Sequence, residues 1–159
     1  RPRHEEIITK CREVGARIML IGDGDVSGVI ATSTEEAGVD IYMGTGGAPE
    51  GVLAAAALRC IGGQMQGRLV FRNDDERDRA VRLGVKEFDK KYSLMELAGG
   101  ETMFAATGVT MGTMLKGVRR FKGGATTHSL IMRSKSGTVR YIEAEHNFDH
   151  KSELETTDG

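Results

Sequence analysis

Hydrophobic and polar positions along the first two thirds of the chain alternate between short apolar runs and helically spaced segments. Apolar residues at helical spacing predict helices over residues 4–14, 26–32, 52–61, 74–83 and, shorter, 92–97. Continuous apolar runs predict buried strands over residues 16–21, 39–43, 66–71 and 102–106. The first two of these runs lead directly into loops of glycine and acidic residues, which is where chemistry is expected in an α/β sheet.

The last third of the chain has the pattern of hairpins. Strand-like runs cover residues 118–121, 126–133 and 138–145, and Ser134-Lys135-Ser136-Gly137 is a turn signal between the last two. Strands that alternate with helices and are followed by hairpins predict an α/β domain with a mixed sheet and flanking helices. This domain is expected to span residues 1–151, and residues 152–159 form a polar tail.

Composition narrows the class of protein. The length of 159 residues suits one domain, and 22 basic against 23 acidic side chains give a net charge of -1, which argues against a nucleic-acid partner. The apolar stretch 52–58 is too short to cross a bilayer, so no membrane partner is expected. Cys11 and Cys60 are the two cysteines and suit a reducing compartment, which predicts a soluble cytoplasmic protein.

The loop after residues 39–43 carries the most informative pattern. Pro49 suits the first position of a helix, which puts Glu50 in the first turn, near the positive end of the helix dipole. There its carboxylate could bind a divalent cation or act as a base, and the N–H groups of Gly46, Gly47 and Gly51 could contact an oxyanion. The alternative is that Glu50 simply stabilises the first turn.

The loop after residues 16–21 and the start of the chain offer further polar groups. Asp23 and Asp25, separated by Gly24, could bind a metal or accept hydrogen bonds from sugar hydroxyls, or an Asp could cap the following helix. Arg1 and Arg3 flank Pro2 and suit phosphate by charge and donor geometry, although solvated arginines are the common case.

Two phosphate-binding motifs with characteristic glycine spacing are the P-loop and the dinucleotide fingerprint. A P-loop is excluded because Val52 and Leu53, rather than Lys and Ser or Thr, follow Gly51. Gly44 and Gly46 fit the start of the dinucleotide fingerprint, but Pro49 stands where the third glycine belongs. Asp74 and Asp75, expected to end the strand over residues 66–71, keep a dinucleotide-binding domain open as an alternative.

Taken together, the loops resemble those of a known family. The chain contains, in this order, Arg1-Pro-Arg-His, Gly-Asp-Gly-Asp-Val around Asp23, Met-Gly-Thr-Gly-Gly-Ala-Pro-Glu-Gly-Val around Glu50, and Gly-Gly-Ala-Thr-Thr-His-Ser around His128. This order resembles the class II (GlpX-type) fructose-1,6-bisphosphatases, some of which also hydrolyse sedoheptulose-1,7-bisphosphate. The likeness runs from Arg1 to about His146.

The resemblance implies a layered α/β/α/β/α sugar-phosphatase fold and a Mg²⁺- or Mn²⁺-dependent reaction in gluconeogenesis. It implies that Glu50 is a metal ligand and therefore a catalytic residue. By the same resemblance, the other matched positions contact the sugar bisphosphate: Asp23, Gly24, Asp25 and Gly47, with Arg1, Pro2 and Arg3 holding the phosphate that is not cleaved.

Chains of this family are about twice as long, and the resemblance covers only their carboxyl-terminal half. Their other metal ligands lie in an amino-terminal Trp-Asp-Pro motif, and this chain contains no Trp. The expectation is therefore an inactive half that needs the amino-terminal half as its partner, in an enzyme that is expected to be a homo-oligomer. A non-catalytic phosphosugar-binding module remains a further alternative.

Overall fold

The computed structural model describes residues 1–150, and the expected polar tail, residues 152–159, lies outside them. The helices are α1 (Glu5–Glu13), α2 (Asp25–Ala31), α3 (Ala48–Ile61), α4 (Asp74–Arg82) and α5 (Leu94–Leu97), with 3₁₀ turns at Pro2–His4 and Glu35–Ala37. The strands are β1 (Gln66–Gly67), β2 (Tyr92–Ser93), β3 (Met103–Thr107), β4 (Arg119–Phe121), β5 (Gly124–Arg133) and β6 (Thr138–Asn147). No helix within the described range has both the length and the apolar character needed to span a membrane.

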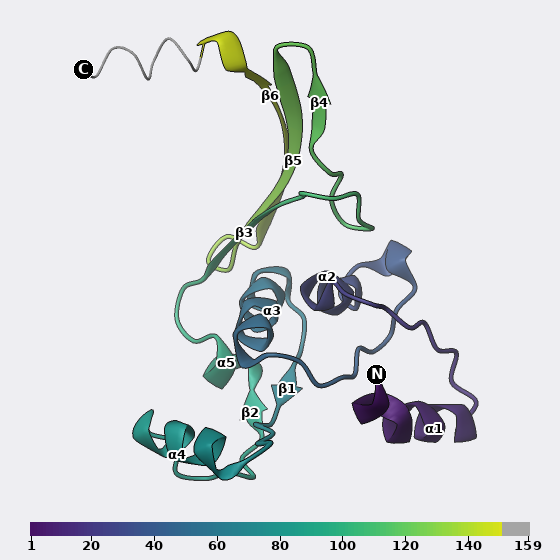
Figure 1. Ribbon diagram of the computed structural model, residues 1–159, viewed down its shortest axis with the longest axis vertical. Coiled ribbons are helices and arrows are strands. Elements are labelled where there is room, and N and C mark those ends of the chain that lie inside the picture. The colour runs from purple at the N-terminus through teal and green to yellow at the C-terminus, as the bar shows by residue number, and fades with distance from the viewer. Residues whose placement is uncertain (151–159) are drawn as a thin grey trace.

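The long strand β5 organises the main sheet. One edge of β5 pairs with β6 along its whole length, from Gly124 opposite Asn147 to Arg133 opposite Thr138. The other edge pairs with β4 and then with β3, and all of these pairs are antiparallel. The hairpin turn predicted at residues 134–137 is confirmed, and Gly137 takes a positive φ of 58° there. In Figure 1 the far part of this sheet projects as an arm beyond the helices.

The hydrophobic core forms where α3 packs on the base of this sheet. Leu130 and Met132 of β5 are each 1% exposed, and they share one buried cluster with Phe104 of β3. From α3, Ala57 and Cys60 enter the same cluster. Small side chains on α3 let the helix approach the base of the sheet closely, and Ile30 of α2 enters the same cluster.

Two predicted strands are extended but unpaired. Residues 16–21 and 39–43 form no strand ladder within residues 1–150, and the predicted strand over 66–71 shrinks to Gln66–Gly67. A strand needs a neighbour for its backbone N–H and C=O groups, which an apolar pattern alone does not supply. Their apolar side chains are therefore exposed, with Met19 at 71% and Leu20 at 68%. The α/β class is confirmed, but these strand predictions were wrong.

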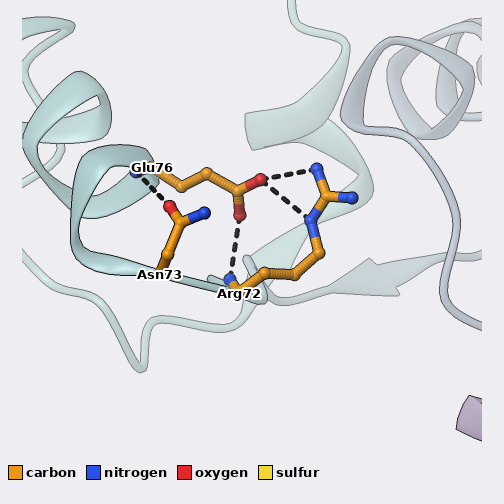
Figure 2. A network of polar contacts seen from close by, with 3 residues as sticks. All are labelled: Arg72, Asn73 and Glu76. Carbon is orange, nitrogen blue, oxygen red and sulfur yellow. Dashed lines mark hydrogen bonds and ion pairs between the residues drawn. The ribbon is translucent and has the colours of Figure 1, made fainter.

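The helix α4 begins one residue after its N-cap, Asn73, whose side chain accepts a hydrogen bond of 2.9 Å from the backbone N–H of Glu76. Figure 2 shows the carboxylate of Glu76 reaching back to the backbone N–H and guanidinium of Arg72. Asp74 and Asp75 consequently belong to the first turn of a helix. The prediction that they end a strand was wrong, because the chain between Gly67 and Asn73 lacks a partner strand in the described residues.

Candidate functional site

The helix α2 starts with the residues Gly24 and Asp25. Gly24 is the N-cap and has a positive φ of 77°, a conformation that glycine adopts without strain. No side chain caps α2, so neither aspartate fills the capping role that was the alternative for this loop. Asp25 is half-buried and accepts a hydrogen bond of 3.0 Å from the hydroxyl of Tyr42, whereas Asp23 is exposed.

The helix α3 starts at the second glycine loop. Gly47 is its N-cap, Pro49 takes the second helical position rather than the predicted first, and Glu50 lies in the first turn as predicted. The Glu50 carboxylate folds back over Gly47, where any Cβ would collide with Oε2. A Cβ on Gly46 would lie 3.0 Å from Oδ2 of Asp25. Two carboxylates, one from each helix start, thus lie against neighbouring glycines.

The start of the chain contacts the same loop through Thr45. Arg3 donates from Nε to the carbonyl oxygen of Thr45 at 2.8 Å. The N–H of Thr45 donates to Nε2 of His4 at 2.9 Å. These contacts join residues 41 or 42 positions apart in the sequence. They bring Arg3 to the loop that carries Gly46 and Gly47.

The phenol of Tyr42 is the donor to Asp25 at this site. Burial raises the pKa of Tyr42 to about 12, and the hydrogen bond and negative charge of Asp25 act in the same direction. The positive charge of Arg3 lowers this pKa in part, which means that the guanidinium lies within electrostatic range of the phenol. Tyr42 therefore remains a hydrogen-bond donor to Asp25 at neutral pH.

The structure brings Arg3, Asp25, Gly46, Gly47 and Glu50 to one surface. Of the other sequence candidates, Gly24 is the N-cap directly before Asp25, and Arg1, Pro2 and Asp23 are exposed. Sequence reasoning missed Thr45 and the side chains of Tyr42 and His4. One signal in the sequence points to them: each lies within or next to a motif whose other residues are candidates for the site.

The donor atoms of the site decide which part of a metal centre its residues could form. Within residues 1–150 no three His, Cys, Asp or Glu side chains gather closely enough to hold a metal ion. The carboxylate of Glu50 is a hard oxygen donor of the kind that Mg²⁺ and Mn²⁺ accept, but one such ligand makes only part of a site. The residues present fit one side of a metal centre.

The site is an open surface rather than an enclosed cavity. A hollow of about 370 Å³ lies elsewhere, between the end of α2 and the β5–β6 hairpin, and is lined by residues such as Ile30, Leu130 and Tyr141. The candidate site instead offers carboxylates, glycine N–H groups and a guanidinium along two helix starts. Groups of these kinds are the ones that proteins use to contact anionic groups and hydroxyls.

Comparison with known proteins defines the family. Residues 1–146 match the family model described as bacterial fructose-1,6-bisphosphatase, glpX-encoded, and the chain belongs to this family. Membership in a phosphatase family gives no support to the dinucleotide-binding alternative, and neither does the helical position of Asp74 and Asp75.

Three cyanobacterial relatives carry the name D-fructose 1,6-bisphosphatase class 2/sedoheptulose 1,7-bisphosphatase. The protein of Microcystis aeruginosa is 43% identical over 94% of this chain and 47% of its own length. The protein of Synechocystis sp. is 43% identical over 92% of this chain and 46% of its own length. That of Trichodesmium erythraeum is 41% identical over 98% and 49%. The chain spans about half the length of these relatives.

Proposed function

We propose that this chain is the substrate-holding part of a metal-dependent phosphatase that removes the 1-phosphate of fructose 1,6-bisphosphate. The observation that carries the proposal is the convergence of Asp25, Glu50 and Arg3 on the loop of Gly46 and Gly47. The names of the relatives support this substrate class, and sedoheptulose 1,7-bisphosphate is the second substrate that they suggest.

In this proposal Glu50 holds a Mg²⁺ or Mn²⁺ ion from one side. The ion would stabilise charge on the phosphoryl oxygens and lower the pKa of an attacking water. Glu50 suits this role because it lies in the first turn of α3, near the positive end of the helix dipole. The remaining metal ligands would come from the amino-terminal half of the enzyme.

The sugar bisphosphate would lie across the starts of α2 and α3. Asp23 and Asp25 would accept hydrogen bonds from sugar hydroxyls, with Gly24 allowing the turn, and the N–H of Gly47 would face a substrate oxygen. Arg1 and Arg3, with Pro2 between them, would hold the phosphate that is not cleaved. The contact of Arg3 with Thr45 uses Nε, so the terminal nitrogens of its guanidinium still suit a phosphate.

The proposal includes partners and location. The amino-terminal half of the enzyme is the necessary partner, and a homo-oligomer is expected. A cytoplasmic location remains a prediction from the sequence. Since one carboxylate leaves most coordination positions to water, the chain alone is expected to release little or no phosphate from the substrate.

The test supplies the missing half. The 159-residue chain is mixed with the amino-terminal half of a cyanobacterial relative, and Mn²⁺-dependent phosphate release from fructose 1,6-bisphosphate is measured. We expect activity from the mixture and not from the chain alone. Glu50→Gln should abolish it, because the amide cannot replace a charged metal ligand. Glu143→Gln is the matched control, since Glu143 forms an exposed ion pair with Lys116 far along the sheet.

Two results would contradict the proposal. Turnover by the chain alone would mean that the metal site is complete without the other half. Activity in the Glu50→Gln mixture would remove Glu50 from the metal site.

A phosphosugar-binding module without catalytic activity is the second candidate function. It is favoured by the lack of a three-residue metal cluster among the described residues. Calorimetry with fructose 1,6-bisphosphate in the presence and absence of EDTA separates the two. Affinity that does not change on metal removal, together with no turnover when the other half is supplied, would favour the module.

A further inference from the structure

The start of the chain holds the loop of residues 44–47 through the backbone N–H and carbonyl oxygen of Thr45. The N–H of Thr45 donates to Nε2 of His4, and the carbonyl oxygen of Thr45 accepts from Nε of Arg3. The His4 ring also lies close to Gly44, at 3.7 Å from the position that a Cβ would take there. Two consecutive residues, Arg3 and His4, thus hold the backbone of Thr45 through its carbonyl oxygen and its N–H.

The distances show which hydrogen bond Nε2 of His4 makes. Nε2 lies 2.9 Å from the backbone nitrogen of Thr45 and 3.3 Å from its carbonyl oxygen. The same nitrogen cannot accept from the first and donate to the second, and the shorter contact is the better hydrogen bond. Nε2 of His4 is therefore assigned as the acceptor from the N–H of Thr45, and Arg3 is the donor to the carbonyl oxygen.

This contact acts on a loop whose other anchor, Tyr42, is held by Asp25 and by packing against the buried cluster of Val29, Ala54 and Leu58. Residues 39–46 belong to no strand ladder within the described range, so sheet pairing does not set their position. Gly46 and Gly47 directly follow Thr45, and the carboxylates of Asp25 and Glu50 lie against these two glycines. A shift of Thr45 would move the glycine N–H groups relative to both carboxylates.

We infer that His4 is a positioning residue for sugar-bisphosphate binding, acting through Thr45. It fixes the loop of Gly46 and Gly47 against the carboxylates of Asp25 and Glu50, while the paired contact from Arg3 orients a guanidinium toward the same surface. His4 itself does not touch the ligand. This inference rests on the proposed function, and its test is designed to separate the two.

The first measurement needs no ligand. Backbone amide exchange is followed by NMR in the ¹⁵N-labelled chain. His4→Phe keeps a ring but removes the acceptor, and His4→Gln restores an acceptor at a similar reach. His128→Phe is the matched control, because Nδ1 of His128 also accepts a backbone N–H, that of Lys116, at 3.1 Å in the sheet. We expect faster exchange at Thr45 in His4→Phe, near-normal exchange in His4→Gln, and no change at Thr45 in His128→Phe.

The second measurement is calorimetric titration with fructose 1,6-bisphosphate in the presence of Mn²⁺. Loss of one neutral hydrogen bond predicts about three- to tenfold weaker binding in His4→Phe. Affinity close to that of the wild type is expected in His4→Gln, because Gln restores the acceptor for the N–H of Thr45. The same is expected in His128→Phe, because the contact of His128 is with Lys116 in the sheet.

The outcomes separate the inference from the proposed function. If the wild type binds no sugar bisphosphate, the proposed function fails, and the role of His4 in binding fails with it. If the wild type binds and His4→Phe binds equally well, only the inference is overturned. Unchanged exchange at Thr45 in His4→Phe overturns the grip on the loop, whatever the titrations give.

Discussion

The sheet formed by β3 to β6 and the region of residues 1–47 differ in how they are held. In the sheet, β5 is paired along both edges, and its inward side chains Leu130 and Met132 are almost completely buried. In residues 1–47, two apolar segments run as coil with exposed side chains, away from the arm in Figure 1. The candidate site is built on the second region. The coil segments of the second region are therefore less buried than the sheet, although α2 within this region contributes Val29 and Ile30 to the core.

The helix α3 connects these two regions. Its later residues, among them Ala57 and Cys60, pack into the core against the sheet. Its first turn carries Glu50, and its N-cap is Gly47. The helix thus connects the end of the site that carries Glu50 to the packed core. The loop before the helix is held by the hydrogen bonds of Thr45 and Tyr42. Substitutions in the two regions should have different consequences, which the following predictions test.

The largest expected effect concerns the core. Leu130→Ala should lower the free energy of unfolding by about 2–5 kcal/mol, because the lost contacts leave a cavity between β5 and α3. Leu20→Ala is the matched control: Leu20 is 68% exposed, and its truncation should change stability by about 0.5 kcal/mol or less. Urea denaturation measures both. A large loss in Leu20→Ala would mean that the coil of residues 16–21 is packed in solution, and the contrast between the regions would fail.

A smaller effect is expected from two glycines. A Cβ on Gly124 would collide with the backbone oxygen of His146 and lie 2.7 Å from the ring of Phe121, so Gly124→Ala should cost about 1–3 kcal/mol. Gly51 lies in α3 with nothing within 4 Å of its added Cβ. Gly51→Ala should stabilise the chain by about 0.5–1 kcal/mol through helix propensity. Chemical denaturation measures the sign of the change in unfolding free energy for both variants. A destabilising Gly51→Ala would show that the first turn of α3 is strained.

The fold was predictable from the sequence where local pattern decides the structure. The helix over residues 74–83, predicted from apolar spacing, is observed as Asp74–Arg82, and the hairpin turn before Gly137 was predicted from its residue types. The strands over residues 16–21 and 39–43 were not, because an apolar run shows that a segment is extended but not which partner it pairs with. Pairing depends on distant segments, and within the described residues those partners are absent.

The same distinction explains the candidate site. Glu50 in a first turn follows from Pro49 and the glycine loop, since both signals are local. The grip of His4 on Thr45 joins residues 41 positions apart, and no local pattern marks it. The hydrogen bond from Tyr42 to Asp25 is also non-local, and Tyr42 looked like an ordinary strand residue in the sequence. The candidate residues in the glycine loops were predictable from local motifs, whereas the non-local contacts of His4 and Tyr42 needed the structure.

The smallest expected effect on stability concerns Tyr42. Tyr42→Phe removes one half-buried hydrogen bond to Asp25 and should lower the free energy of unfolding by about 1 kcal/mol or less. That is well below the effect of Leu130→Ala, as expected for one half-buried polar contact beside the core. A loss as large as that of Leu130→Ala would contradict this view of the contact.

Titration of Tyr42 sharpens the same prediction. Its pKa is raised from 10.0 to about 12, by burial first and then by Asp25, so the folded chain retains the phenolic proton that the unfolded chain loses. The contribution of this group to stability is therefore fully present below pH 10 and is lost as the pH rises toward 12. Ultraviolet absorbance of tyrosinate should contain a late transition in the wild type that disappears in Tyr42→Phe and persists in Tyr141→Phe. If the late transition survives in Tyr42→Phe, the phenol does not donate to Asp25 in solution, and the start of α2 is held by other contacts.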